Sequence, residues 1–287
     1  MPETLTTSPA AARSSSEAAA GPGPRRRRLS EFAPRLQTIS TKAFVSSIGL
    51  IVLAAAWQIL PSAHIVDPAF ITPLSQVIST WWHMLQDGSL WSNTSTSLLR
   101  AAIGFFAAVI VGVPLGLVIG ANRRAEDLLS PVLELFRNTA PLALLPVFIL
   151  ILGIGQVTKF VFVGYACLFP ILLNTIAAVR TVDPLLVKAA RVFGYSQLRI
   201  FQKVVLPASV PQIFTGIRLA ASYALLVLIA AEYIGANSGL GFLIDNSEQN
   251  FQTPMMYAAI ITMSLIGVLI NFDLLRIERR LSTWRTA

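Results

Sequence analysis

Long apolar runs, separated by short polar stretches, dominate the chain from residue 44 onward. A helix needs about 20 apolar residues to cross ~30 Å of hydrocarbon. Six runs are candidates for such spans, and they lie at about 44–60, 98–120, 139–153, 158–179, 213–235 and 256–275. The pattern predicts an all-α membrane protein with six transmembrane helices.

Two segments next to these runs have amphipathic patterns. The third run is short and contains Pro141 and Pro146, and residues 128–136 before it predict an interfacial helix. In the polar segment 61–97, apolar residues recur at helical spacing. They are Leu74, Val77, Ile78, Trp81, Trp82 and Leu85. This spacing predicts a helix on the membrane surface, with Trp at head-group depth.

The composition agrees with a membrane protein and offers little for catalysis. Hydrophobic residues make up 54% of the chain and charged residues 13%, whereas soluble domains carry about 25% charged residues. A single cysteine, Cys167, excludes an intramolecular disulfide and a cysteine-based metal cluster. The two histidines, His64 and His83, lie far apart and outside any metal-binding motif. We therefore expect no catalytic residues and no metal site.

The distribution of charge predicts the orientation. All but two of the 22 Lys and Arg residues, Arg100 and Lys159, fall in segments that share one side of the membrane if the N-terminus is cytoplasmic. Cytoplasmic segments are the ones that carry an excess of Lys and Arg. We expect residues 1–42, which include the run Arg25 to Arg28, to form a disordered basic cytoplasmic tail. The membrane domain is then 43–280, and 281–287 form a cytoplasmic C-terminal tail.

A basic, polar stretch at 183–211 interrupts the apolar runs and predicts two short helices with a joint. Asp183 is a good N-cap, Pro184 suits the first helical position, and Gly194 can adopt the left-handed conformation that ends a helix. Ser196 can cap the second helix. We expect Pro207 and Pro211 to bound the element. The apolar faces comprise Leu185, Leu186, Ala189, Ala190 and Phe193, then Leu198, Phe201 and Val205.

The spacing within this stretch resembles a known motif. Ala189-Ala190-x3-Gly194 followed by Leu206-Pro207 is similar to the EAA loop in the membrane subunit of bacterial ABC importers, although Lys188 stands where that family usually has Glu. The resemblance implies coupling helices that dock on an ATPase subunit. Coupling would then involve Lys188, Ala189, Ala190, Gly194, Leu206 and Pro207.

Further motifs extend the resemblance over roughly residues 44–280. Leu98 to Phe105 with Gly112 to Gly116 resembles the family's second span, and Ser130 to Gly155 its third. Ala231 to Ala236 with Gly239 to Ile244 resembles the nitrate, sulfonate and taurine branch in particular. Glycines 112, 116 and 120, spaced four apart, predict a close helix contact.

The resemblance implies a permease subunit that pairs with a second copy, docks two ATPase subunits in the cytoplasm and receives solute from an external binding protein. The chain has no Gly-x-x-x-x-Gly-Lys-[Ser/Thr] loop, so ATP would bind the partner subunits and this chain would need no cofactor. The branch favours a small anion such as nitrate, a sulfonate or taurine. Nucleic acid is not an expected partner, whereas membrane lipid is.

Polar residues within or near the spans are candidates for the pathway, because intramembrane ionisable groups usually face a bundle interior or a watery cavity. These are Glu232, Asn174, Lys159 and Arg100. Lys159 is a possible partner for Glu232, and Arg100 and Lys159 are cations that could concentrate anions at the outer mouth. Structural pairing of Glu232, and snorkelling of both cations to lipid head groups, remain open. A secondary transporter driven by an ion gradient, or a non-transporting scaffold, would be the alternative function.

Overall fold

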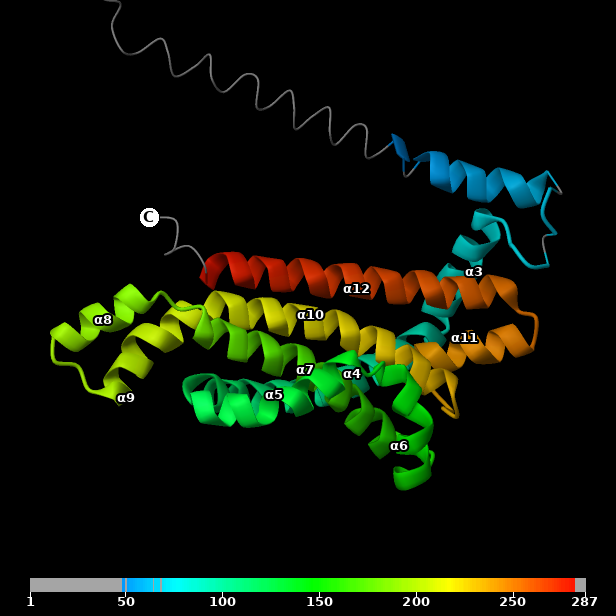
Figure 1. The fold of residues 1–287 in the computed structure, drawn as a ribbon. Coiled ribbons are helices and arrows are strands. Elements are labelled where there is room, and N and C mark those ends of the chain that lie inside the picture. The colour runs from blue at the N-terminus through cyan, green and yellow to red at the C-terminus, as the bar shows by residue number, and fades with distance from the viewer. Residues whose placement is uncertain (1–47, 50, 64, 68, 282–287) are drawn as a thin grey trace, which may run out of the picture. The chain divides into compact units, whose positions relative to one another are not determined.

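The computed structural model describes residues 48–281 except positions 50, 64 and 68, and every regular element in this part of the chain is helical (Figure 1). The all-α fold class is confirmed, whereas the tail predicted at 1–42 lies outside the described residues. The elements are α3 Leu74–Gln86, α4 Ser89–Ala121, α5 Arg123–Asn138, the 3-10 helix η1 Pro141–Leu144, α6 Leu145–Leu152, α7 Gln156–Arg180, α8 Pro184–Val192, α9 Gln197–Ile200, the π-helix η2 Phe201–Val205, α10 Leu206–Tyr233, α11 Leu240–Gln249 and α12 Thr253–Leu281.

The number of membrane-spanning helices differs from the expected six. Within the described residues, four helices are long and apolar enough to span: Ser89–Ala121, Gln156–Arg180, Gln197–Tyr233 and Thr253–Glu278. The predicted interfacial helix at 128–136 and the predicted third span at 139–153 correspond to the helices Arg123–Asn138 and Pro141–Leu152, which form a pair bent by 88°. Pro141 lacks the N–H that would continue α5. The predicted first span appears as the shorter apolar helix Ile51–Ser62, so six spans are not confirmed.

Among the described residues, helices α4 and α7 form the most extensive helix–helix contact, and glycines allow their close approach. A Cβ added at Gly116 would lie 2.6 Å from the Cβ of Thr175, and one added at Gly120 would lie 2.9 Å from the Cβ of Val179. The two helices run parallel, since larger numbers on α4 meet larger numbers on α7. The predicted close contact through glycine is confirmed, and its partner is α7.

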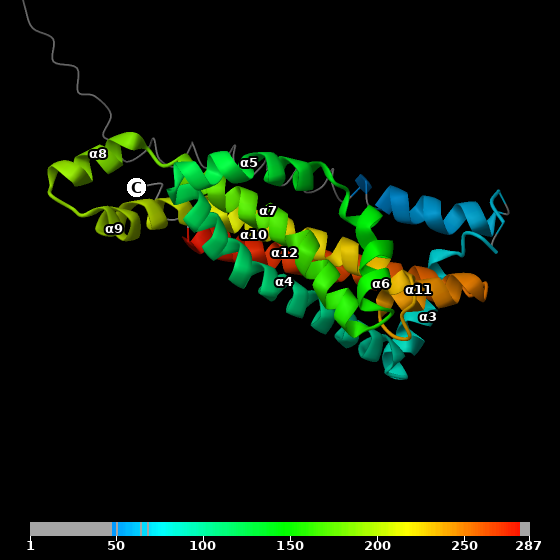
Figure 2. The same cartoon turned by 60° about the horizontal axis from the view of Figure 1, so that its bottom comes forward.

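Helix α10 packs antiparallel to α7 and to α12, so that α7, α10 and α12 lie side by side (Figure 1). Helices α8 and α9 extend from one end of this bundle, and α6 and α11 lie toward the other (Figures 1 and 2). We call these the α8 end and the α11 end.

Helix α3 lies where the sequence predicts an amphipathic helix, and part of its apolar face packs inside the protein. Val77 and Met84 are buried, and the indole N–H of Trp81 donates to the Thr262 hydroxyl on α12 at 2.9 Å. The depth of these tryptophans in a membrane stays a prediction. Trp81 is half-buried and Thr262 supplies an acceptor for its N–H, whereas Trp82 is exposed.

The glycine contact predicts a specific sensitivity to volume. Gly116→Ala should destabilise the bundle by about 1–3 kcal/mol, the usual cost of overpacking a tight core. Gly267→Ala on α12 is the matched control, because its added Cβ would find its nearest neighbour, Leu225 Cδ1, at 3.6 Å. Thermal unfolding of the purified variants measures the difference. Equal midpoints for the two variants would contradict the contact.

Candidate functional site

A buried ion pair lies where α4 and α10 meet toward the α11 end. Arg100 Nη1 on α4 lies 2.5 Å from Glu232 Oε1 on α10, and both side chains are 1% exposed. Transferring either charge alone from water into such surroundings would cost several kcal/mol. The pair persists because each charge compensates the other at contact distance.

Hydrogen bonds satisfy the remaining polar atoms of the pair. Glu232 Oε2 accepts from the Ser97 hydroxyl at 2.7 Å and from the Gly241 N–H at 3.0 Å. Arg100 donates from Nε to Gln156 Oε1 at 2.6 Å, and from Nη1 and Nη2 to the carbonyl oxygen and hydroxyl of Ser238 at 2.6 and 3.0 Å. The network therefore ties together α4, α7, α10, α11 and the loop before α11.

Two glycines allow the loop to approach the carboxylate closely. Gly239 has φ +115°, a left-handed conformation that side chains disfavour, and a Cβ there would collide with the Glu232 carboxylate. A Cβ at Gly241 would lie 2.6 Å from the Cβ of Glu232. Because a side chain at either position would collide with Glu232, the close approach of this loop requires glycine at both 239 and 241. Sequence reasoning noted these residues as a family motif without finding this cause.

The network changes two expectations. Glu232 pairs with Arg100, and among the described residues no ion pair joins it to Lys159, which is itself only 5% exposed. Arg100 is not an accessible cation at the mouth of a pathway, because it is buried and its charge is compensated. The pathway roles of Glu232, Lys159 and Arg100 stay predictions, and the argument that these cations concentrate anions loses its support.

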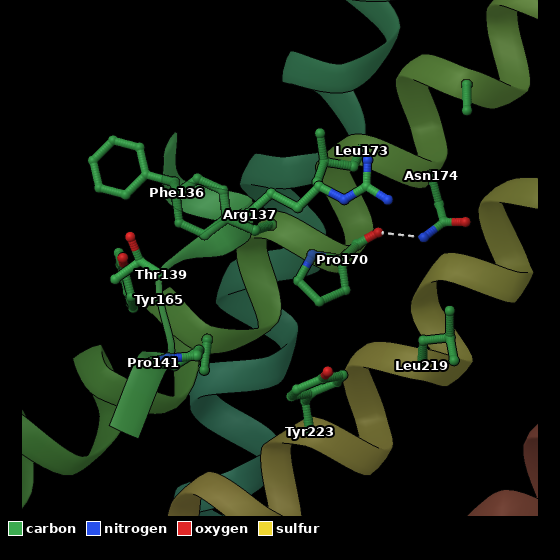
Figure 3. Close-up of a pocket in the computed structure, with 13 residues that line it drawn as sticks. Phe136, Arg137, Thr139, Pro141, Tyr165, Pro170, Leu173, Asn174, Leu219 and Tyr223 are labelled. Atoms are coloured by element: carbon green, nitrogen blue, oxygen red, sulfur yellow. Dashed lines mark hydrogen bonds between the residues drawn. The ribbon is translucent and has the colours of Figure 1, made fainter. Parts of the chain in front are cut away.

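Asn174 lies apart from this network, in a cavity of about 490 Å³ between α5, α7 and α10 (Figure 3). Its amide Nδ2 donates to the Pro170 carbonyl oxygen at 2.8 Å, which fixes the amide at the wall. Arg137, Tyr165 and Tyr223 line the same cavity. Sequence reasoning singled out Asn174 but missed the other three, since Arg137 was counted among the cytoplasmic cations.

The 183–211 stretch begins as the sequence predicts. Asp183 Oδ1 accepts from the Leu185 N–H at 2.8 Å, and Pro184 takes the first helical position of α8. Gly194 has φ +78°. It ends α8 in a Schellman motif, in which its own N–H donates to the Arg191 carbonyl and the Tyr195 N–H donates to the Ala190 carbonyl. Ser196 precedes α9 without a side-chain capping hydrogen bond.

The end of the stretch differs from the prediction. Pro207 and Pro211 do not bound the element, because α9, η2 and α10 form one helical path over Gln197–Tyr233. The wider π-turn of η2, in which the Leu206 N–H donates to the Phe201 carbonyl, relieves the clash that Pro207 would cause in a regular helix. The Ser209 hydroxyl lies 2.8 Å from the Val205 carbonyl oxygen and 3.1 Å from that of Ala178 on α7.

Most side chains of α8 and α9, which we call the wedge (Pro184–Ile200), are exposed. Of the predicted coupling residues, Lys188, Ala189 and Gly194 are exposed, Ala190 is buried, and Leu206 and Pro207 are half-buried. The exposed large apolar residues are Leu185, Leu186, Val192, Phe193 and Leu198. Several large apolar side chains exposed on one short segment are typical of an interaction site.

The ion pair predicts a large asymmetry between single and double substitutions. Glu232→Gln should leave the Arg100 guanidinium buried without a counter-charge and destabilise the protein by about 3–5 kcal/mol. The double variant Arg100→Met with Glu232→Gln should recover much of that loss. Thermal unfolding measures both. A double variant less stable than Glu232→Gln alone would contradict the pairing.

Comparison with known proteins finds a matching family model and several relatives. The family model described as "Binding-protein-dependent transport system inner membrane component" matches residues 112–283. The taurine transport system permease protein of Escherichia coli is 32% identical, over 83% of this chain and 89% of its own. A putative aliphatic sulfonates transport permease protein of Bacillus subtilis is 33% identical, over 82% and 86%. The nitrate import permease protein of Leptolyngbya laminosa is 31% identical, over 80% and 84%.

A solved structure shares the fold. A chain of a methionine ABC transporter in an inward-facing conformation superposes with a TM-score of 0.59 and 20% identity, over 70% of this chain and 96% of that one. These matches favour an ATP-driven importer over a transporter driven by an ion gradient, and they identify a transport subunit rather than an enzyme. The chain belongs to the family of inner membrane components of binding-protein-dependent transport systems, as the permease subunit of an ABC importer.

Proposed function

We propose that this permease imports a small anion of the sulfonate, taurine or nitrate class, along a pathway formed with a second copy of itself. The names of three relatives, which describe taurine, sulfonate and nitrate transport, support the solute class. The cytoplasmic partners are ABC ATPase subunits, which bind the ATP, and an external binding protein delivers the solute. The family description, which names a binding-protein-dependent system, supports that partner.

The exposed wedge carries the proposal that the ATPases dock at the α8 end. Its apolar side chains, among them Val192 and Phe193, are exposed, and burying them against a partner would lower the free energy. Basic residues flank them, namely Lys188, Arg191, Arg199 and Lys203. An apolar patch with a basic rim fits a cleft on a soluble partner better than it fits hydrocarbon.

The continuous helical path gives the wedge a mechanical connection to the rest of the subunit. Helix α10 has 28 residues and extends about 42 Å. It begins directly after η2 and carries Glu232 next to its last residue, Tyr233. A force applied to α9 therefore reaches the ion-pair network through one helix. ATP-driven closure of the ATPases would move the wedge, and α10 would transmit this motion toward the α11 end.

Charge supports the orientation with the wedge in the cytoplasm. Most of the Lys and Arg residues whose side chains the structure describes lie at or near the α8 end, namely Arg123, Arg124, Arg180, Lys188, Arg191, Arg199 and Lys203. Cytoplasmic ends of spans carry the excess of Lys and Arg. We therefore place the α8 end, the N-terminus and the C-terminus in the cytoplasm.

Gly194 provides the test of coupling. Gly194→Val should weaken ATPase docking and reduce uptake at least about tenfold, because a β-branched residue disfavours the left-handed conformation. A Cβ there would meet no atom within 4 Å, so the effect would come from backbone conformation rather than collision. Uptake is measured in vesicles that contain the ATPases and the binding protein, with taurine, an alkanesulfonate and nitrate as solutes.

Gly194→Asn is the matched control, since Asn tolerates the left-handed region and should retain uptake. Lys188→Glu, which restores the family's usual residue, should also retain it. Wild-type uptake by Gly194→Val would refute coupling through this joint. Delivery of neutral or cationic solutes alone would refute the solute class and leave the family assignment intact.

Sidedness gives a second test. The background has Cys167 replaced by Ala. Ser92 lies in the first turn of α4, which we place outside, so Ser92→Cys should react with an impermeant thiol reagent in intact cells. A cysteine at Ser196 in the wedge should react only after the membrane is opened. Both positions are exposed, so accessibility of the side chain does not confound the comparison. Reaction of Ser196→Cys in intact cells would reverse the proposed orientation.

A further inference from the structure

Arg137 lies beside the middle of the bundle rather than at its α8 end, and contacts between α5 and α7 establish this. Near its start, α5 pairs Glu126 with Arg180, the last residue of α7. Near its end, Phe136 stacks on Phe169 with ring centroids 5.0 Å apart. The two helices therefore run antiparallel. Arg137 lies beside the middle of α7, on the order of 15 Å from the α8 end along the helix axis.

A charged side chain at this depth needs water or a polar partner. Arg137 is 64% exposed, and its pairing with Glu134 is loose, with Nη1 and Oε1 3.5 Å apart and both side chains exposed. Charged side chains within a membrane rarely face lipid and almost always face the interior or a water-filled cavity. The cavity that Arg137 lines is such a surface, so this face of α5, α7 and α10 is a candidate wall of the aqueous pathway.

The chemistry of the cavity suits a small organic anion. Figure 3 shows the Arg137 guanidinium extended toward Leu173 and Asn174, while Tyr223 approaches the cavity from α10. A guanidinium binds tetrahedral oxyanions through paired N–H donors. The aromatic rings of Tyr165 and Phe169 offer an apolar surface for a short carbon stem.

We propose that Arg137 selects the anion inside the pathway, by holding the sulfonate or equivalent group of the solute while its stem lies against the α7 aromatic residues. This inference rests on the proposed import of a small anion and adds the residue and the site. Arg137 suits this role better than Arg100, whose side chain is buried and whose charge Glu232 compensates.

A charge-matched pair of thiol reagents tests the site without knowledge of the natural solute. Leu173→Cys, with Cys167 replaced by Ala, places one thiol at the cavity wall of the full chain in membrane vesicles. Its reaction rates with the anionic sulfonatoethyl and the cationic trimethylammonioethyl methanethiosulfonates give a ratio. Arg137→Gln should lower the anionic-to-cationic ratio about tenfold, since the guanidinium attracts one reagent and repels the other. Arg137→Lys should keep most of it.

The matched control is Arg276→Gln. Arg276 forms the same kind of loose pair with a carboxylate three residues earlier, Asp273 at 3.8 Å, and is similarly exposed at 69%, but it does not line the cavity. This variant should leave the ratio unchanged. An unchanged ratio in Arg137→Gln, or an equal fall in Arg276→Gln, would overturn the proposal.

A protection measurement separates binding from simple steering. Ethanesulfonate should slow the reaction of the anionic reagent with the thiol of Leu173→Cys when Arg137 is present. In Arg137→Gln, ethanesulfonate should no longer slow this reaction. Equal protection in the two backgrounds would overturn the assignment of Arg137 as the binding group. Because neither measurement uses the ATPases or the binding protein, their failure would leave the import of anions by the whole complex standing. Failure of that import would instead appear in the uptake assay.

Discussion

A guanidinium and a carboxylate that both lie out of reach of water set the main constraint on this subunit. Arg100 and Glu232 can remain charged there only while they stay in contact and keep their hydrogen bonds. The partners of these bonds come from four helices and one loop. Any motion that separated α4 from α10 at this end would expose two uncompensated charges to apolar surroundings. The network therefore favours movement of this end as one body.

The other end of α10 has the opposite character. The wedge exposes apolar side chains, and the joint at Gly194 depends on backbone conformation alone, since open space surrounds it. Between the two ends, α10 passes Pro207 and Pro211 without a break because η2 widens the helix before the first proline. A continuous helix thus connects the exposed wedge to the buried ion pair. This connection is the basis for the proposed transmission of motion from a docked partner to the core.

Local sequence signals predicted the local features well. The cap at Asp183, the left-handed Gly194 and the close packing of glycines 116 and 120 all follow from residue chemistry at fixed spacing. Features that depend on distant partners were not predictable in the same way. The Arg100–Glu232 pair joins residues 132 positions apart, and nothing near either residue identifies its partner. Similarly, the sequence predicted an interfacial helix at 128–136 followed by a short span at 139–153, but not the 88° bend between them.

The depth of a cation, and how firmly its charge is compensated, decide whether it can act on a passing anion. The charge of Arg100 is firmly compensated, because Glu232 is close, buried and held by further hydrogen bonds. Glu134 beside Arg137 differs, since exposed ion pairs contribute only about 0–1 kcal/mol. A solute anion that offers several oxygens to the guanidinium can displace so weak a partner. When the anion leaves, Arg137 pairs with Glu134 again. This exchange allows the site to bind the anion and still release it.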